Sequence, residues 1–244
     1  MYLLYYWPGI QGRGEFVRLA LEEAGAGYRD VARESGRGAG MPAMLKLLDG
    51  HDATRRPSFA PPFLKSGRLM IGQTANILQY LGKRHGLAPR DEAGRLWIQA
   101  LQLTIADFVV EVHDTHHPVA AMLYYEDQKK EAKRRAADFL KSRLPKFLGY
   151  FETILARNPR GMHYLAGSRL SYADLSMFQM IAGLSYAFPN AAARQAGKFK
   201  RVFALHARIQ ERERIMAYLA SERRIPFNND GIFRHYAELD TRSR

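Results

Sequence analysis

Two adjacent tyrosines, Tyr5 and Tyr6, lie near the end of YLLYYW, a short apolar run at residues 2–7 that predicts a buried strand. Neighbouring side chains of a strand point to opposite faces, so only one of the two phenol groups can point into a given site. A phenol that donates a hydrogen bond to a sulfur anion favours the ionised form of a thiol. The chain contains no cysteine, so a thiol of this kind must arrive with a ligand.

A second pair with chemical potential, Gln73 and Thr74, stands where a helix is predicted to begin. The free N–H groups and the positive dipole end at such a position can hold a carboxylate. The Thr74 hydroxyl could instead serve only as an N-cap, and the two roles are compatible.

Three histidines, His113, His116 and His117, form a cluster in which the first and last are four residues apart. This spacing suits two metal ligands on one helical face. No glutamate-containing zinc signature accompanies them and no third ligand is implied, so we expect no metal site.

The composition is that of an ordinary globular protein with a basic surface. The 244 residues suit one large domain or two modest ones, with 47% hydrophobic and 25% charged residues. The net charge of +13 is spread along the chain without a nucleic-acid motif, so we expect a solvated surface and no nucleic-acid partner. Neither a signal peptide nor an apolar stretch near the ~20 residues of a membrane span is evident. We expect a cytoplasmic protein with no membrane partner.

The first part of the chain alternates strand and helix patterns. The predicted elements are a strand at 2–7, a helix ending near residue 24, a strand at 28–32, a short helix at 41–50, a hairpin within 63–72 and a helix at 74–85. A strand–helix–strand unit forces a parallel pair, whereas a hairpin is antiparallel. We therefore predict a mixed sheet of about four strands with helices on both faces, in a domain at residues 1–86.

After a proline-containing break at residues 87–92, interpreted as a linker, only helical patterns follow. Helices are predicted at 93–123, 128–157, 171–187, 197–209 and 211–221, and coil with at most one helical turn follows them. The second domain, residues 93–244, is therefore predicted to be all-helical. Ser171 and Asp174 have the spacing of a capping box, which we assign to folding and not to catalysis.

Three motifs in chain order resemble the glutathione transferase superfamily. YYWPGIQGRGEFVRLALEEAG resembles the first strand, loop and helix of its tyrosine-type classes (alpha, mu, pi and sigma). PPFLKSGRLMIGQTANILQYLGKRHGL resembles its proline-containing strand, hairpin and Gln-Ser helix start, and SRLSYADLSMF its buried capping box. The resemblance implies a thioredoxin-like βαβ-ββα domain followed by an all-helical domain, glutathione as co-substrate, no metal and a homodimer. It also implies a glutathione S-transferase that conjugates the glutathione thiolate to a hydrophobic electrophile.

Two other functions remain open. The same thiolate serves glutathione-dependent isomerases and peroxidases, and the sequence does not separate these from a transferase. A non-catalytic glutathione-fold binding protein is the third possibility. Retention of Tyr6, Gln73 and Thr74 argues against it.

The resemblance assigns catalysis to Tyr6 and not to Tyr5, because Tyr6-Trp7 matches the Tyr-Trp pair of the mu class. Trp7 is counted among the glutathione-binding residues. The loop at residues 8–13 is one residue longer than in the mu class, which leaves a shift of the catalytic tyrosine open.

The resemblance also assigns binding residues to glutathione. Gln73 and Thr74 correspond to the pair that holds its γ-glutamyl carboxylate, and Pro62 corresponds to the cis-proline of the family. The residue before that proline pairs, backbone to backbone, with the cysteinyl part. Here this residue is Pro61, which has no N–H, so one expected hydrogen bond is missing.

Three further sets of residues are candidates by resemblance. The glycyl carboxylate is expected to be held by one of Lys46, His51, Arg55 and Arg56. An acidic residue that contacts the γ-glutamyl ammonium across a dimer is expected at Asp107 or Glu111, four residues apart on one helical face. A solvated helix surface is the alternative for that pair. The second substrate is expected to lie against Trp7, Ile10, Phe108, Tyr124 and Tyr125, although aromatic residues at helical spacing often belong to a core.

Overall fold

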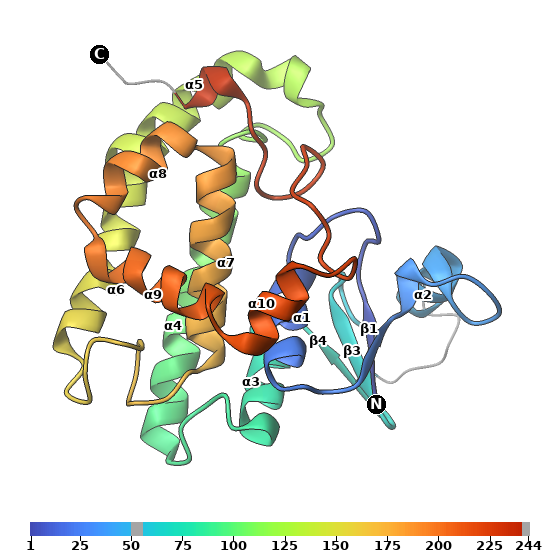
Figure 1. The fold of residues 1–244 in the computed structure, drawn as a ribbon. Coiled ribbons are helices and arrows are strands. Elements are labelled where there is room, and N and C mark those ends of the chain that lie inside the picture. Colours follow the sequence, from blue (N-terminus) through green and yellow to red (C-terminus); the bar gives the residue numbers. More distant parts are fainter. Residues whose placement is uncertain (50–55, 241–244) are drawn as a thin grey trace.

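The N-terminal part of the chain folds into a four-stranded sheet with helices on both faces (Figure 1). The computed structural model describes residues 1–49 and 56–240. The strand order is β2-β1-β3-β4; β1 runs parallel to β2 and antiparallel to β3, and β3 is antiparallel to β4. The elements are β1 (Tyr2–Tyr5), α1 (Gly14–Glu23), β2 (Tyr28–Asp30), the 3-10 turn η1 (Val31–Arg33), α2 (Gly40–Leu48), β3 (Phe63–Ser66), β4 (Leu69–Gly72) and α3 (Thr74–His85).

Alternation along β1 gives each face of the sheet its own core. Leu4 belongs to the main core together with Phe16 of α1. Tyr5 points to the opposite face, where it packs in a smaller cluster with Met44 of α2. Because the side-chain period of a strand is two residues, the next side chain, Tyr6, returns to the α1 face.

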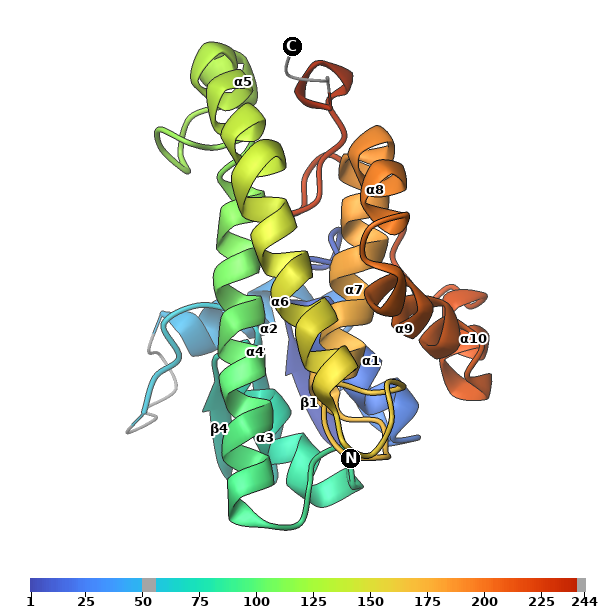
Figure 2. The ribbon, with the colours of Figure 1, turned by 90° about the vertical axis from the view of Figure 1, so that its left-hand side faces the viewer.

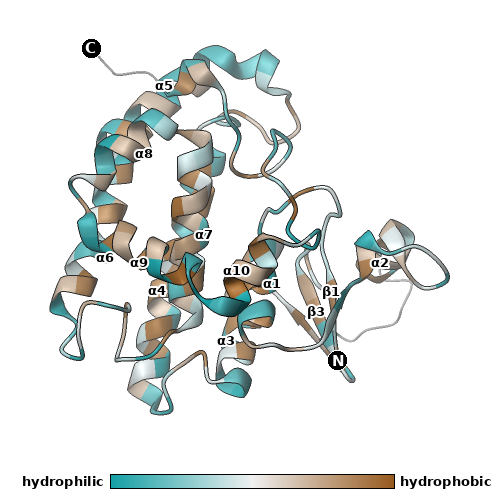
Figure 3. Ribbon diagram, in the orientation of Figure 1, coloured by the Kyte–Doolittle hydropathy of each residue, from teal (hydrophilic) through white to brown (hydrophobic). Residues whose placement is uncertain are grey.

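The remainder of the chain is helical, and its central helix α7 is buried along nearly its whole length. It contacts α1, α4, α8 and α9, and Figure 2 shows it behind α4 and α6. Figure 3 shows α5 as a mostly hydrophilic helix at the edge of this part. No helix in residues 1–49 and 56–240 combines the length and the apolarity needed to cross a bilayer. The elements are α4 (Glu92–His113), η2 (Tyr125–Gln128), α5 (Lys129–Asp138), the π-helical turn η3 (Phe139–Arg143), α6 (Leu144–Arg157), α7 (Tyr172–Ala187), α8 (Pro189–Ala196), α9 (Lys200–Gln210), α10 (Glu213–Leu219) and η4 (Ala237–Leu239).

A C-terminal segment, residues 220–240, runs back from α10 along the helical part (Figure 1). It has little regular structure, yet Ile232 and Phe233 are buried. The Phe233 ring lies so close to Gly183 of α7 that a Cβ there would be 2.4 Å from it. Asp240 accepts the first N–H groups of α8 at 2.7 and 3.0 Å. The segment is thus held at its middle and at its end.

The structure confirms the predicted fold class and corrects several boundaries. The helix expected at 93–123 ends at His113. Pro118 explains why it does not continue, because proline lacks an N–H and disfavours a helical conformation at the preceding residue. The short helix α8, which begins with Pro189 in its first turn, was not predicted. The domain boundaries at 86 and 93 stay predictions.

Candidate functional site

Tyr6 follows β1 directly, and its side chain is enclosed at the start of α1. It is only 4% exposed. Gly12 and Gly14 pack against it so closely that an added Cβ would lie 2.0 Å from the Tyr6 hydroxyl oxygen at Gly12 and 2.5 Å from the ring at Gly14. The main-chain N–H of Arg13 donates a hydrogen bond of 2.8 Å to the Tyr6 hydroxyl oxygen. The glycines of this loop are therefore required for the ring to reach its place.

The Tyr6 hydroxyl is a protonated hydrogen-bond donor at neutral pH. Burial raises the pKa of the phenol, and the N–H groups of Arg13 and Gly14 oppose this effect. The phenol therefore keeps its proton at neutral pH. Its oxygen sits at the N-terminus of α1, where the helix dipole and the unpaired N–H groups stabilise negative charge. Among the described residues no side chain or carbonyl accepts the Tyr6 proton, so a ligand atom can.

Tyr5 is placed on the other side of the sheet. Its ring stacks on Phe63 with 4.8 Å between ring centres and an interplanar angle of 16°. This packing belongs to the cluster under α2, so the two tyrosines serve different faces of the sheet.

Thr74 and Gln102 line one small cavity, and each has a buried side-chain oxygen without a hydrogen-bond partner among the described residues. Thr74 Oγ1 and Gln102 Oε1 accept or donate no hydrogen bond among the described residues. Both residues line a cavity of about 30 Å³, together with Arg13 and Phe16. Buried polar atoms are nearly always hydrogen-bonded, so an unpartnered pair at one cavity indicates a polar ligand or water. The N-cap of α3 is Gln73 and not Thr74, and the unpartnered Thr74 hydroxyl is available to a ligand.

The backbone around this cavity is unusual at Gln73. Its φ of 68° and ψ of 123° are rarely adopted by a residue other than glycine. Such conformations cost about 1–3 kcal/mol and persist mostly at functional sites. The Pro61–Pro62 peptide bond is cis, as expected for Pro62, and Pro61 is half-buried just before β3.

The structure does not gather the residues that were expected to hold the glycyl carboxylate and the γ-glutamyl ammonium of glutathione. Lys46 and Arg56 are exposed, and His51 and Arg55 lie outside the described residues. Asp107 is exposed on α4. Glu111 is engaged within its own chain, because Arg143 Nε donates to it at 2.8 Å and Arg135 also contacts it.

The contacts of Glu111 with the two arginines affect the pKa of its carboxyl group. Burial alone would raise its pKa, but hydrogen bonds and charge from Arg143 and Arg135 hold the pKa below its ordinary value. The carboxylate is therefore ionised and already neutralised.

The residues expected around the second substrate divide into exposed and core positions. Trp7 and Tyr124 are exposed, and Ile10 is half-buried beside the C-terminal segment. Phe108 is instead fully buried and stacks on Phe147 of α6 with 4.3 Å between ring centres. Tyr125 is likewise buried, stacked on Tyr236, with its hydroxyl donating to Glu238. Both rings fill cores and offer no surface to a ligand.

The three histidines gather at the end of α4 with ring centres 4.7 to 5.3 Å apart. His116 Nε2 lies 2.8 Å from the carbonyl oxygen of Ile232, which ties the turn after α4 to the C-terminal segment. Burial lowers the pKa of His116 to about 3 and that of His117 to about 4, so both are neutral at pH 7. Within residues 1–49 and 56–240 no three side chains are arranged to hold a metal ion.

Sequence reasoning missed Arg13 and Gln102 as members of the site. Arg13 is visible in the sequence only as one basic residue among 37. Gln102 lies five residues before Asp107 on the same helix, but a polar residue among apolar ones gave no signal of its own.

The sequence is similar to curated glutathione S-transferases over most of its length. Glutathione S-transferase P 1 of Xenopus laevis is 25% identical over 226 residues, which cover 91% of this chain and 93% of the relative. Glutathione S-transferase P of Bos taurus is 26% identical over 235 residues, which cover 94% and 98%. A family model described as "Glutathione S-transferase, C-terminal domain" matches residues 113–222.

Solved structures share the fold. The Pi-class glutathione S-transferase of Onchocerca volvulus matches with a TM-score of 0.68 at 23% identity, covering 89% of this chain and 91% of that one. Prostaglandin synthase D of Nilaparvata lugens matches with a TM-score of 0.67 at 20% identity, covering 90% and 97%. The family model over residues 113–222 and the relatives that span nine-tenths of the sequence support assignment of this chain to the glutathione S-transferase superfamily, and its two-part fold agrees with them.

Proposed function

We propose that this protein is a glutathione transferase that binds glutathione in the N-terminal domain and uses Tyr6 to hold the sulfur as a thiolate. The thiolate then attacks a hydrophobic electrophile. The observation that carries the proposal is the Tyr6 hydroxyl itself: it is protonated, it lies at the N-terminus of α1, and its proton has no acceptor among the described residues.

The energy required of Tyr6 is modest. A free thiol with a pKa near 8.5 is mostly protonated at neutral pH. Lowering that pKa by about two units takes ~2.7 kcal/mol of preferential stabilisation of the thiolate. A hydrogen bond to a charged group contributes about 1.5–3 kcal/mol, so one phenol supplies most of the effect.

The polar groups that line this small cavity suit the charged end of glutathione. Thr74 Oγ1 and the first N–H groups of α3 suit the γ-glutamyl carboxylate. Arg13 lines the same cavity, so its charge can attract that carboxylate. Gln102 Oε1 is an acceptor without a partner, which is the chemistry that the neighbouring ammonium needs.

Titration calorimetry with glutathione tests the proposal. We expect wild type to bind glutathione and to conjugate it in an aromatic-halide assay. Thr74→Val, which keeps the shape but removes the hydroxyl, should weaken binding about 10- to 100-fold through loss of a charge-assisted hydrogen bond.

The matched control is Ser176→Ala in α7. Its hydroxyl is also buried without a partner but lies on another element, so its removal should leave glutathione affinity unchanged. Absence of any heat of binding with wild type would end the proposal. Binding without turnover would favour the glutathione-binding protein instead.

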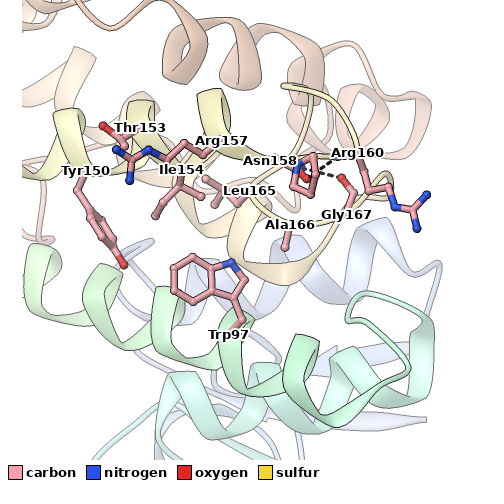
Figure 4. Close-up of a pocket in the computed structure, with 11 residues that line it drawn as sticks. Trp97, Tyr150, Thr153, Ile154, Arg157, Asn158, Arg160, Leu165, Ala166 and Gly167 are labelled. Atoms are coloured by element: carbon pink, nitrogen blue, oxygen red, sulfur yellow. Dashed lines mark hydrogen bonds between the residues drawn. The ribbon is translucent and has the colours of Figure 1, made fainter.

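We also propose that two copies of the chain pair through the exposed face of α4. Leu96, Leu103 and Val110 are spaced by seven residues, so they form one stripe, and they are 63%, 52% and 45% exposed. Beside the stripe, Trp97 of α4 faces Tyr150 and Ile154 of α6 across a cleft of about 440 Å³ (Figure 4).

The apolar character of this surface supports a second copy as its occupant. The walls of the cleft are mostly apolar. An apolar stripe and cleft that are exposed side by side are typical of a protein interface. A symmetric pair would cover the same surface on both copies.

Sedimentation velocity tests this pairing. Wild type should sediment as a dimer, whereas Leu103→Glu should shift the population to monomer because it buries an unpaired charge in the interface. Met122→Glu changes an equally apolar but off-stripe position and should remain dimeric. A wild type that is monomeric at micromolar concentration would contradict the pairing.

A further inference from the structure

Gln11 is a buried polar residue in the loop between β1 and α1, and its side chain contacts the helical part of the chain. It is 5% exposed. Its Nε2 donates to the main-chain carbonyl of Ile225 in the C-terminal segment, and its Oε1 accepts from Gln179 Nε2 of α7 at 2.7 Å. Both ends of the amide are therefore bound to the helical part of the chain.

The main-chain carbonyl of Gln11 is also occupied. It accepts the N–H of Glu15 at 3.0 Å, which closes the first turn of α1. It accepts a second hydrogen bond, of 3.3 Å, from the buried guanidinium of Arg18. Side chain and backbone of one residue thus connect the start of α1 to α7 and to the C-terminal segment.

Further buried partners extend this connection. Arg224 donates to Gln179 Oε1 at 3.1 Å and forms an ion pair with Glu15. Tyr218 of α10 donates to the same Glu15 carboxylate at 2.6 Å. Each of these groups is buried or nearly so, and such networks hold their members in one arrangement.

Arg13, which follows Gln11 by two positions, contacts the Tyr6 hydroxyl. Arg13 N–H donates to that hydroxyl, and Gly12 and Gly14 enclose the ring. An N–H that donates to a phenol oxygen makes the phenol a stronger donor through its own proton. The strength of this effect depends on where the start of α1 lies.

We propose that Gln11 is a positioning residue for Tyr6: by fixing the start of α1 to the helical domain, it aims the Arg13 N–H at the Tyr6 oxygen. This inference rests on the proposed function. Gln11 acts through Tyr6 and does not itself contact the sulfur.

The alternative is that Gln11 only stabilises the fold. The two roles differ in one respect. A purely structural residue lowers activity whether or not Tyr6 has its hydroxyl, whereas a positioning residue has nothing to position in Tyr6→Phe.

A double-mutant cycle separates them, with wild type, Gln11→Met, Tyr6→Phe and the double variant. Methionine keeps the volume of glutamine and removes its hydrogen bonds. The readouts are the apparent pKa of the enzyme-bound glutathione thiol, from thiolate ultraviolet absorbance, and the pH profile of kcat/KM.

We expect Gln11→Met to raise the apparent pKa of the bound thiol by about 0.5–1 unit and to lower kcat/KM at neutral pH by about 3- to 10-fold. In the Tyr6→Phe background the same change should produce no further shift. Gln195→Met, at a buried glutamine of α8, is the control and should leave the thiol pKa at the wild-type value.

The conservative variant Gln11→Glu adds a pH signature. Its carboxyl group can donate to the Ile225 carbonyl only when protonated, and burial raises the pKa of such a group. Its kcat/KM relative to wild type should therefore recover as the pH falls.

Two results would overturn the inference while leaving the proposed function intact. One is a wild-type thiol pKa in Gln11→Met, and the other is an equal loss in both backgrounds. If Gln11→Met does not fold, Gln179→Met removes one of the two side-chain hydrogen bonds of Gln11, together with the bond from Arg224, and should show the same dependence on Tyr6 with a smaller shift. A wild type with no bound thiolate, or Tyr6→Phe with an unchanged thiol pKa, would overturn both proposals together.

Discussion

Tyr6→Phe should lower kcat/KM for conjugation by about 10- to 100-fold, because the lost hydrogen bond to a charged sulfur contributes ~1.5–3 kcal/mol. The substitution removes one oxygen and leaves the ring between Gly12 and Gly14 undisturbed. The affinity for glutathione should change little, since the hydroxyl acts on ionisation of the thiol more than on binding of the tripeptide. Steady-state kinetics together with calorimetry measure the two effects separately.

The control for this experiment is Tyr5→Phe. The Tyr5 ring stacks on Phe63 in the core under α2, on the opposite face of the sheet. Its hydroxyl should therefore not affect turnover. Equal losses from the two substitutions would show that the catalytic proton does not come from Tyr6 alone.

Asp174→Ala should reduce the free energy of unfolding by about 3–5 kcal/mol, because it leaves buried donors without a partner. The Asp174 carboxylate accepts the main-chain N–H of Leu165 at 2.7 Å and that of Ser171 at 2.8 Å. The Ser171 hydroxyl donates to it at 2.6 Å. All of these groups lie at the start of the central helix α7, so the loss affects the middle of the helical core.

Urea denaturation measures the effect, and Asp91→Ala is its matched control. Asp91 is also a helix N-cap, for α4, but it is exposed and accepts only the N–H of Gly94 at 2.7 Å. Its loss should cost about 1 kcal/mol, the ordinary value for a cap. Similar losses at the two sites would mean that burial of the Asp174 carboxylate has no special role in stability.

The order of the elements could be predicted because each has a local pattern with clear ends. The helix Thr74–His85 was predicted with its observed bounds, and Gly86 ends it in the left-handed conformation that glycine adopts readily. The helix expected at 93–123 was too long because apolar residues continue past Pro118 in the sequence. The periodicity of apolar residues does not show where a proline such as Pro118 removes a main-chain N–H.

The chemistry of the site could be predicted only in part, because its contacts join distant segments. Thr74 and Gln102 meet through the packing of α3 and α4, which no local pattern encodes. Phe108 is apolar whether it faces a pocket or a core, and its stacking partner Phe147 comes from another helix. Glu111 likewise finds Arg143 at a separation of 32 residues.

The buried ion network between the two parts of the chain constrains how this protein can change over generations. Glu15 and Arg18 come from α1, whereas Tyr218 and Arg224 come from the far end of the sequence. A recombination event that exchanged only the first half would combine charges that no longer match, and every mismatch would bury an uncompensated ion. A substitution at one end of this network is therefore expected to need a compensating change at the other end of the chain.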